Sequence, residues 1–81
     1  MGTDANLYPT PTRLRLLDDI HAGLVHRDEL GEVWLSDGGT WKVTAQVEEM
    51  ERAGWVLDAG PRIERTALGD AIAAQHTRSG A

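Results

Sequence analysis

The absence of cysteine from a chain of only 81 residues is the strongest constraint on its fold. Folding at this size hides only about 60% of the surface that the unfolded chain exposes, so the core must be well packed. Without cysteine, neither a disulfide nor a thiolate zinc site can add stability. Hydrophobic residues make up 41% of the chain, which is too many for a wholly disordered protein. The sequence therefore predicts one small globular domain.

The ends of the chain and the lengths of its apolar runs predict its compartment and its boundaries. No apolar run approaches the roughly 18 residues that a membrane span needs. Residues 1–9 have neither the basic nor the apolar part of a secretory signal, which predicts a cytoplasmic protein. We expect residues 1–9 to form a flexible arm, residues 10–75 the domain, and residues 76–81 a flexible tail.

Hydrophobic spacing predicts three helices. Thr10-Pro11 places a capping hydroxyl before a helical proline, and the apolar intervals of three and four that follow predict a helix over 11–22. A second stripe of this kind, formed by Val43, Val47 and Met50, predicts a helix over 40–53. A final short helix is expected from the Thr66 cap through Gln75.

The remaining segments show patterns that are typical of strands. Residues 24–39 combine turn signals with alternating apolar positions, which predicts a small hairpin or one short strand with a loop. Residues 55–57 and 62–65 are predicted to be two strands joined by a tight connection. The order is thus helix, short β segment, helix, hairpin, helix.

Two phrases in the second half of the chain resemble a known family. The first is "TWKVTAQVEEMERAGWV", in which the matching positions are Thr44, Val47, Met50, Glu51, Ala53, Gly54, Trp55 and Val56, and the second contains Thr66 and Gly69. They resemble the winged helix-turn-helix domain, particularly its MarR-like branch as found in high-GC bacteria and their phages. The resemblance implies an α+β fold with three main helices, a short β segment and a two-stranded wing at 55–65. Residues 28–39 depart from the family pattern, because they look more like a strand than like its second helix.

The same resemblance implies a function and a site. It implies a transcriptional regulator, one that a phage could encode, which binds double-stranded DNA in a sequence-specific way through the helix at 41–53 and the wing. The candidate DNA-binding residues are Trp41, Lys42, Thr44, Ala45, Gln46, Arg62 and Arg65. We expect Arg62 and Arg65, on either side of Ile63, to share the solvent side of their strand. Regulators of this class usually pair, so a homodimer through the final helix is also expected.

The net charge of −5 favours a different partner. Affinity for a polyanion comes largely from cations that displace its counterions. The alternative is an interaction module on a winged-helix scaffold that has lost DNA binding and binds a host or partner protein, through its acidic surface or through Trp34 and Trp41. A basic strip joining Lys42, Arg62 and Arg65 would favour DNA, whereas carboxylates around Lys42 would favour protein.

Nothing in the sequence indicates catalysis. The histidines, His21, His26 and His76, lack the spacing of metal ligands. No Ser/His/Asp set, phosphate-binding glycine loop or nucleotide fingerprint is present. The sequence therefore predicts a protein that is not an enzyme, with no catalytic residue, metal or cofactor.

Overall fold

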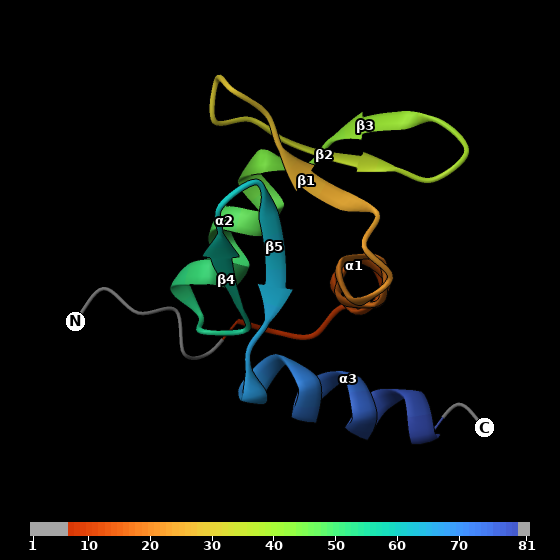
Figure 1. Cartoon of the computed structure of the whole chain (residues 1–81). Helices are drawn as coiled ribbons and strands as arrows, with labels where there is room; N and C mark the ends of the chain where they lie inside the picture. Colours follow the sequence, from red (N-terminus) through yellow and green to blue (C-terminus); the bar gives the residue numbers. More distant parts are fainter. Residues whose placement is uncertain (1–6, 80–81) are drawn as a thin grey trace.

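The computed structural model describes residues 7–79, with side chains as far as residue 76. These residues form a small α+β domain. Its elements follow the order α1 (Pro11–His21), β1 (Val25–Arg27), β2 (Val33–Ser36), β3 (Thr40–Lys42), α2 (Thr44–Arg52), β4 (Val56–Ala59), β5 (Arg62–Arg65) and α3 (Ala67–Ser79). The five strands form one antiparallel sheet in the order β3-β2-β1-β5-β4. Figure 1 shows the β1-β2-β3 part of the sheet on one side of α1 and α3 on the other side.

The sheet consists of a three-stranded part and a two-stranded part with a narrow junction. Strands β1, β2 and β3 form a meander, and β4 pairs with β5 along its whole length. The two parts meet where His26 of β1 pairs with Arg62 of β5. Beside this pair, the Arg27 amide donates a 2.8 Å hydrogen bond to the carbonyl of Pro61.

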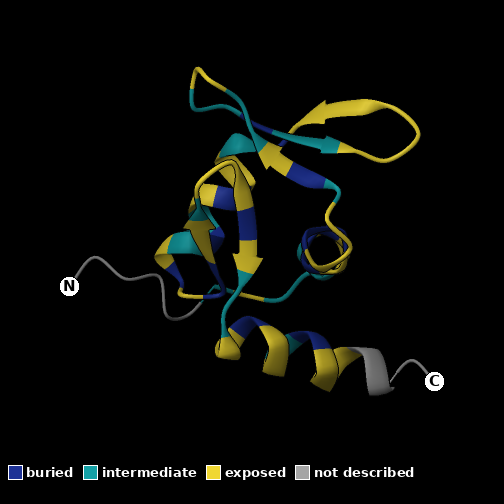
Figure 2. Ribbon diagram, in the orientation of Figure 1, coloured by how far each residue is buried: buried dark blue, intermediate teal, exposed yellow. Residues whose placement is uncertain are grey.

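One apolar core lies between the helices and the inner face of the sheet. Leu17 of α1, Val33 of β2, and Val47 and Met50 of α2 are completely buried. Trp55, directly before β4, is also buried. Figure 2 shows that β3, in contrast, is exposed along its whole length. The sheet therefore extends past the core at its β3 end.

Several predicted elements are confirmed. Helix α1 begins at Pro11 and is capped by Thr10, whose hydroxyl accepts a hydrogen bond from the Arg13 amide. Strands β4 and β5 lie close to the predicted hairpin, and α3 continues past Gln75 to Ser79. Of the predicted arm at 1–9, residues 1–6 lie outside the described part of the chain, and so do residues 80–81 of the predicted tail. Leu7 packs against the core.

The predicted winged helix-turn-helix fold is wrong. Between α1 and α2 the described chain forms the β1-β2-β3 meander, so the second helix of a helix-turn-helix is replaced by strands. The predicted wing is not a separate short hairpin either, because β5 pairs with β1 inside a five-stranded sheet. The physical reason is the two-residue period of the β2 segment, in which Val33 is buried and Trp34 faces the other side, bounded by turns at Gly31 and Gly38.

The predicted start of the second helix is also wrong. Residues 40–42 pair with β2 as strand β3, and α2 begins at Thr44. The Val43 amide donates to the carbonyl of Val33, so the chain leaves the sheet and enters the helix at this residue. At its other end α2 stops before Gly54, whose φ of +82° favours glycine. The Trp55 amide then folds back to donate to the carbonyl of Met50.

Candidate functional site

The structure distributes the predicted DNA-binding residues over several environments. Lys42 and Arg62 lie on the solvent face of the sheet, at opposite ends of a row of cross-strand neighbours. Trp41 and Gln46 line a groove beside α1. Thr44 and Arg65 are engaged inside the domain, and Ala45 is exposed on α2. The seven residues therefore do not form one surface.

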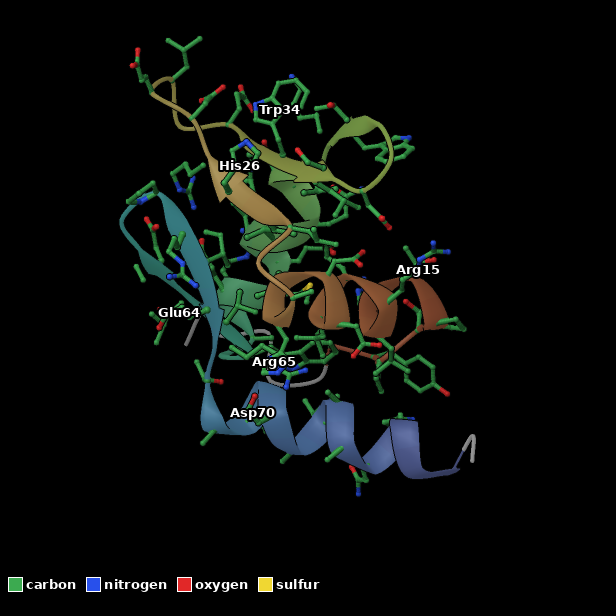
Figure 3. The ribbon with its side chains drawn as sticks, turned by 45° about the vertical axis from the view of Figure 1, so that its right-hand side comes forward. Arg15, His26, Trp34, Glu64, Arg65 and Asp70 are labelled. Atoms are coloured by element: carbon green, nitrogen blue, oxygen red, sulfur yellow. The ribbon has the colours of Figure 1, made fainter. Side chains whose placement is uncertain are left out.

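The row on the solvent face connects Lys42 to Arg62 through Trp34 and His26. Directly opposed residues in antiparallel strands point to the same face, so these four side chains share one side of the sheet. Figure 3 shows His26 and Trp34 near each other on β1 and β2. Arg62 is exposed and forms no ion pair with the described residues.

Carboxylates accompany this row. The Lys42 ammonium lies 4.0 Å from a carboxylate oxygen of Glu32. The Trp34 indole donates a 2.9 Å hydrogen bond to Asp28, and this bond lowers the pKa of the Asp28 carboxyl. The row therefore does not form a basic strip, because acidic groups lie beside two of its four members.

Thr44 has a structural role in the domain. Its hydroxyl accepts a 2.8 Å hydrogen bond from the Val33 amide and donates a 2.7 Å bond to the Glu32 carboxylate. These bonds tie the first residue of α2 to β2. Because Glu32 takes the only hydroxyl proton, donation from Thr44 to a DNA base would require that bond to be broken.

Arg65 lies on the inner side of the sheet, so the prediction that it shares the solvent side with Arg62 is wrong. The two residues are three positions apart, and an odd separation along a strand puts side chains on opposite faces. The Arg65 guanidinium lies 2.8 Å from Asp70 and 3.9 Å from Asp18, and its side chain is only 14% exposed. Figure 3 shows Arg65 and Asp70 beside each other where β5 meets α3.

Two further arginines are also held by carboxylates. Arg13 of α1 lies 3.2 Å from Glu49 of α2. Arg27 lies 3.3 Å from Glu51 and 3.5 Å from Asp58, although its Nε makes no hydrogen bond in the described structure. Burial raises the pKa of the Glu51 carboxyl, and the nearby Arg27 opposes that rise. Acidic groups of the chain itself thus neutralise these two cations.

A groove of about 300 Å³ separates α1 from the β2-β3 hairpin and the start of α2. We call it the Trp41 groove. Its lining residues are Thr12, Arg15, Leu16, Asp19, Leu35, Asp37, Trp41, Val43 and Gln46. Trp41 is 52% exposed although it is the largest apolar side chain in the lining. Its ring lies against Gly39, where an added Cβ would come within 2.9 Å of the indole, so the turn between β2 and β3 helps to position it.

Asp19 is a buried carboxylate in the wall of this groove. Only 9% of its surface is exposed, and its side chain forms no hydrogen bond or ion pair with the described residues. Burial raises the pKa of the Asp19 carboxyl, Asp37 raises it further, and Arg15 lowers it. The groove thus combines an apolar lining with a carboxylate that has no partner.

Sequence reasoning did not identify Asp19 as a site residue. Its position carried a signal, because Leu16, Asp19 and Ile20 follow the three- and four-residue spacing of a buried helix face. A carboxylate on such a face is buried and needs a partner. Leu35 and Asp37 come from a different element, so only the folded chain brings them to the same place.

The comparisons with known proteins assign no role to these residues. No protein-family model, no curated protein and no solved structure matches the chain. Among the residues described, no group of three or more potential metal ligands occurs, and no helix has the length and apolar character needed to cross a membrane. The resemblance to the MarR-like branch stays a prediction from two sequence phrases.

Proposed function

We propose that this chain is a protein-binding domain and that the Trp41 groove is its binding surface. The observation that carries the proposal is the exposed indole of Trp41 in an apolar groove, next to a buried carboxylate without a partner. Tryptophan is enriched among the residues that dominate binding energy, especially where a partner can cover it completely. An apolar centre with polar groups at its edge is also the usual composition of a protein interface.

The size of the groove supports a protein partner. At about 300 Å³ it lies at the lower end of the range of small-molecule pockets. A partner protein can insert one side chain there and gain additional contact area from the exposed residues of β3. Because β3 is an edge strand of the sheet, its unpaired backbone groups are available to the same partner.

The ion pairs argue against the nucleic-acid alternative. A phosphate at Lys42 would compete with Glu32, and a phosphate at Arg65 would compete with Asp18 and Asp70. Sequence-specific binding to duplex DNA stays a prediction, which the exposed Arg62 favours. Homodimerisation through α3 also stays a prediction, for which the 49% exposed Leu68 offers one apolar contact.

A selection from a displayed library of random peptides tests the proposal. We expect the wild-type domain to enrich peptides that bind the Trp41 groove. The Trp41→Ser variant should bind those peptides about 30-fold more weakly, as is typical when an interface tryptophan is removed. The matched control is Leu57→Ser, which removes a similarly exposed apolar side chain (45%) from β4; its affinity should change less than about twofold.

Two results would contradict the proposal. One is a set of enriched peptides that bind Trp41→Ser as well as they bind the wild type. The other is fluorescence anisotropy of a labelled DNA duplex that shows tight binding at low salt, reduced by Lys42→Gln and by Arg62→Gln. The second result would favour DNA binding as the function of the chain.

A further inference from the structure

We infer that the Trp41 groove accepts a cationic side chain, arginine or lysine, that the partner protein presents to Asp19. This inference rests on the proposed function and names the chemistry of the group that enters the groove. Asp19 lines the groove, is nine-tenths buried, and forms no hydrogen bond or ion pair with the described residues. Among the described residues, the Asp19 oxygens are not completely buried atoms without a partner, so they keep some contact with the solvent in the groove. A cation that enters the groove can therefore form a charge-assisted hydrogen bond with this partly desolvated carboxylate.

The charges around the groove give it a preference for cations. Asp37 adds a second carboxylate to the lining, and Arg15 is the basic residue there. Figure 3 shows Arg15 on the side of α1 that faces the β2-β3 hairpin. Arg15 is exposed, so solvent screens its charge and it shields Asp19 only in part. The net charge of the lining is therefore negative.

The apolar lining suits the rest of such a side chain. Arginine and lysine carry a stem of methylene groups, which pack well against apolar surface while the charged end reaches a polar group. Leu35 and Val43 offer that surface. The exposed face of the Trp41 indole attracts a cation placed over the ring, and a planar guanidinium can stack on it.

Burial and the neighbouring Asp37 raise the pKa of the Asp19 carboxyl. Both causes disfavour the carboxylate form when the groove is empty. A bound cation acts in the opposite direction, because it stabilises the charged carboxylate. The groove is thus more favourable for a cation than for an anion or a neutral polar group.

A titration of the full chain by NMR tests the inference with small probes. The probes are N-acetyl-arginine methylamide, its uncharged analogue N-acetyl-citrulline methylamide, and the apolar N-acetyl-leucine methylamide. The readout is the indole N–H signal of Trp41. We expect the arginine probe to shift this signal at millimolar concentration and to bind about tenfold more tightly than the citrulline probe, as one charge-assisted hydrogen bond provides.

Variants locate the cation in the groove. Asp19→Asn should weaken the arginine probe about tenfold, and Asp37→Asn, at an exposed position, should weaken it less. Arg15→Gln should strengthen binding because it removes the competing cation. The control is Glu29→Gln, an exposed carboxylate on the loop between β1 and β2, which should have no effect. A thermal melt of each variant verifies that it is folded.

The outcomes separate this inference from the proposed function. Equal affinity for the arginine and citrulline probes, or no effect of Asp19→Asn together with none of Asp37→Asn, would overturn the inference. If the leucine probe still shifts the Trp41 signal in that case, the groove remains a binding surface with a different preference. If none of the three probes shifts it and the peptide selection also fails, both the inference and the proposed function are wrong.

Discussion

Replacing Gly69 with alanine is expected to destabilise the domain, although alanine is the better helix former. Gly69 lies in the first turn of α3, and its amide donates a 3.1 Å hydrogen bond to the Thr66 hydroxyl. A Cβ at this position would overlap the carbonyl oxygen of Trp55 and lie 3.0 Å from its carbonyl carbon. The Thr66 amide and hydroxyl bond to the carbonyls of Trp55 and Gly54, so the start of α3 is held against the same backbone.

Two opposing terms set the magnitude of this effect. Glycine to alanine inside a helix gains about 1 kcal/mol from propensity. Overpacking costs about 1–3 kcal/mol, and the upper end applies here because the added methyl group meets backbone atoms. The net loss is therefore about 2 kcal/mol. At an unfolding entropy of about 2.1 cal/mol/K per residue, a chain of 81 residues would lose about 12 °C in Tm.

Circular dichroism during thermal unfolding measures this change. The control is Ala71→Gly at an exposed position of α3, which loses only propensity, about 1 kcal/mol, and should lower Tm by about 6 °C. If Gly69→Ala raises Tm or leaves it unchanged, the close approach of α3 to Trp55 is refuted.

Three further predictions concern the charged groups. Arg27→Met should lower the free energy of unfolding by about 2 kcal/mol, because it leaves Glu51 partly buried without its cation; urea unfolding would show a lower midpoint with an unchanged m-value, and an unchanged midpoint would contradict this. The raised pKa of Asp19 means that the folded state holds this proton more tightly than the unfolded state. This group therefore lowers the stability of the fold as pH rises from the ordinary value of 3.8 through the raised pKa. Asp19→Asn should therefore raise Tm at neutral pH and leave it nearly unchanged below pH 3.8, and an equal change at both would refute the assignment. The lowered pKa of Asp28 has the opposite sign, so its stabilising contribution is present above 3.8 and is lost as pH falls through the lowered value; the indole N–H signal of Trp34 should shift over that acidic range in the wild type and not in Asp28→Asn.

The helices and the β4-β5 hairpin could be predicted because their signals are local. The Thr10 cap, the Gly54 stop and the apolar spacing of α1 are all visible within a few residues. The β1-β2-β3 meander could not be predicted from local signals alone. Residues 40–42 precede the stripe of α2 and fit a helix by spacing alone, and only pairing with β2 makes them a strand. Tertiary pairing overrode a local pattern at this position.

The site could be predicted only in part. The sequence predicts Trp41 and Gln46 as DNA contacts, whereas in the structure both line one groove. The Trp41 groove brings together side chains from α1, β2, β3 and α2, and no local pattern specifies such a contact. The pairing of cations with carboxylates is equally non-local, as in Arg13 and Glu49, which are 36 positions apart. A count of charges along the chain could not reveal which cations are already compensated.

The indole N–H signals of the three tryptophans offer the most direct test of the proposed binding surface. Trp41 lines the groove, Trp34 faces the other side of the sheet and donates to Asp28, and Trp55 is buried in the core. In a titration of the full chain with a peptide from the displayed library, followed by NMR, we predict that the Trp41 signal shifts while those of Trp34 and Trp55 stay in place. A shift of the Trp34 signal with an unmoved Trp41 signal would contradict the account and place binding on the solvent face of the sheet.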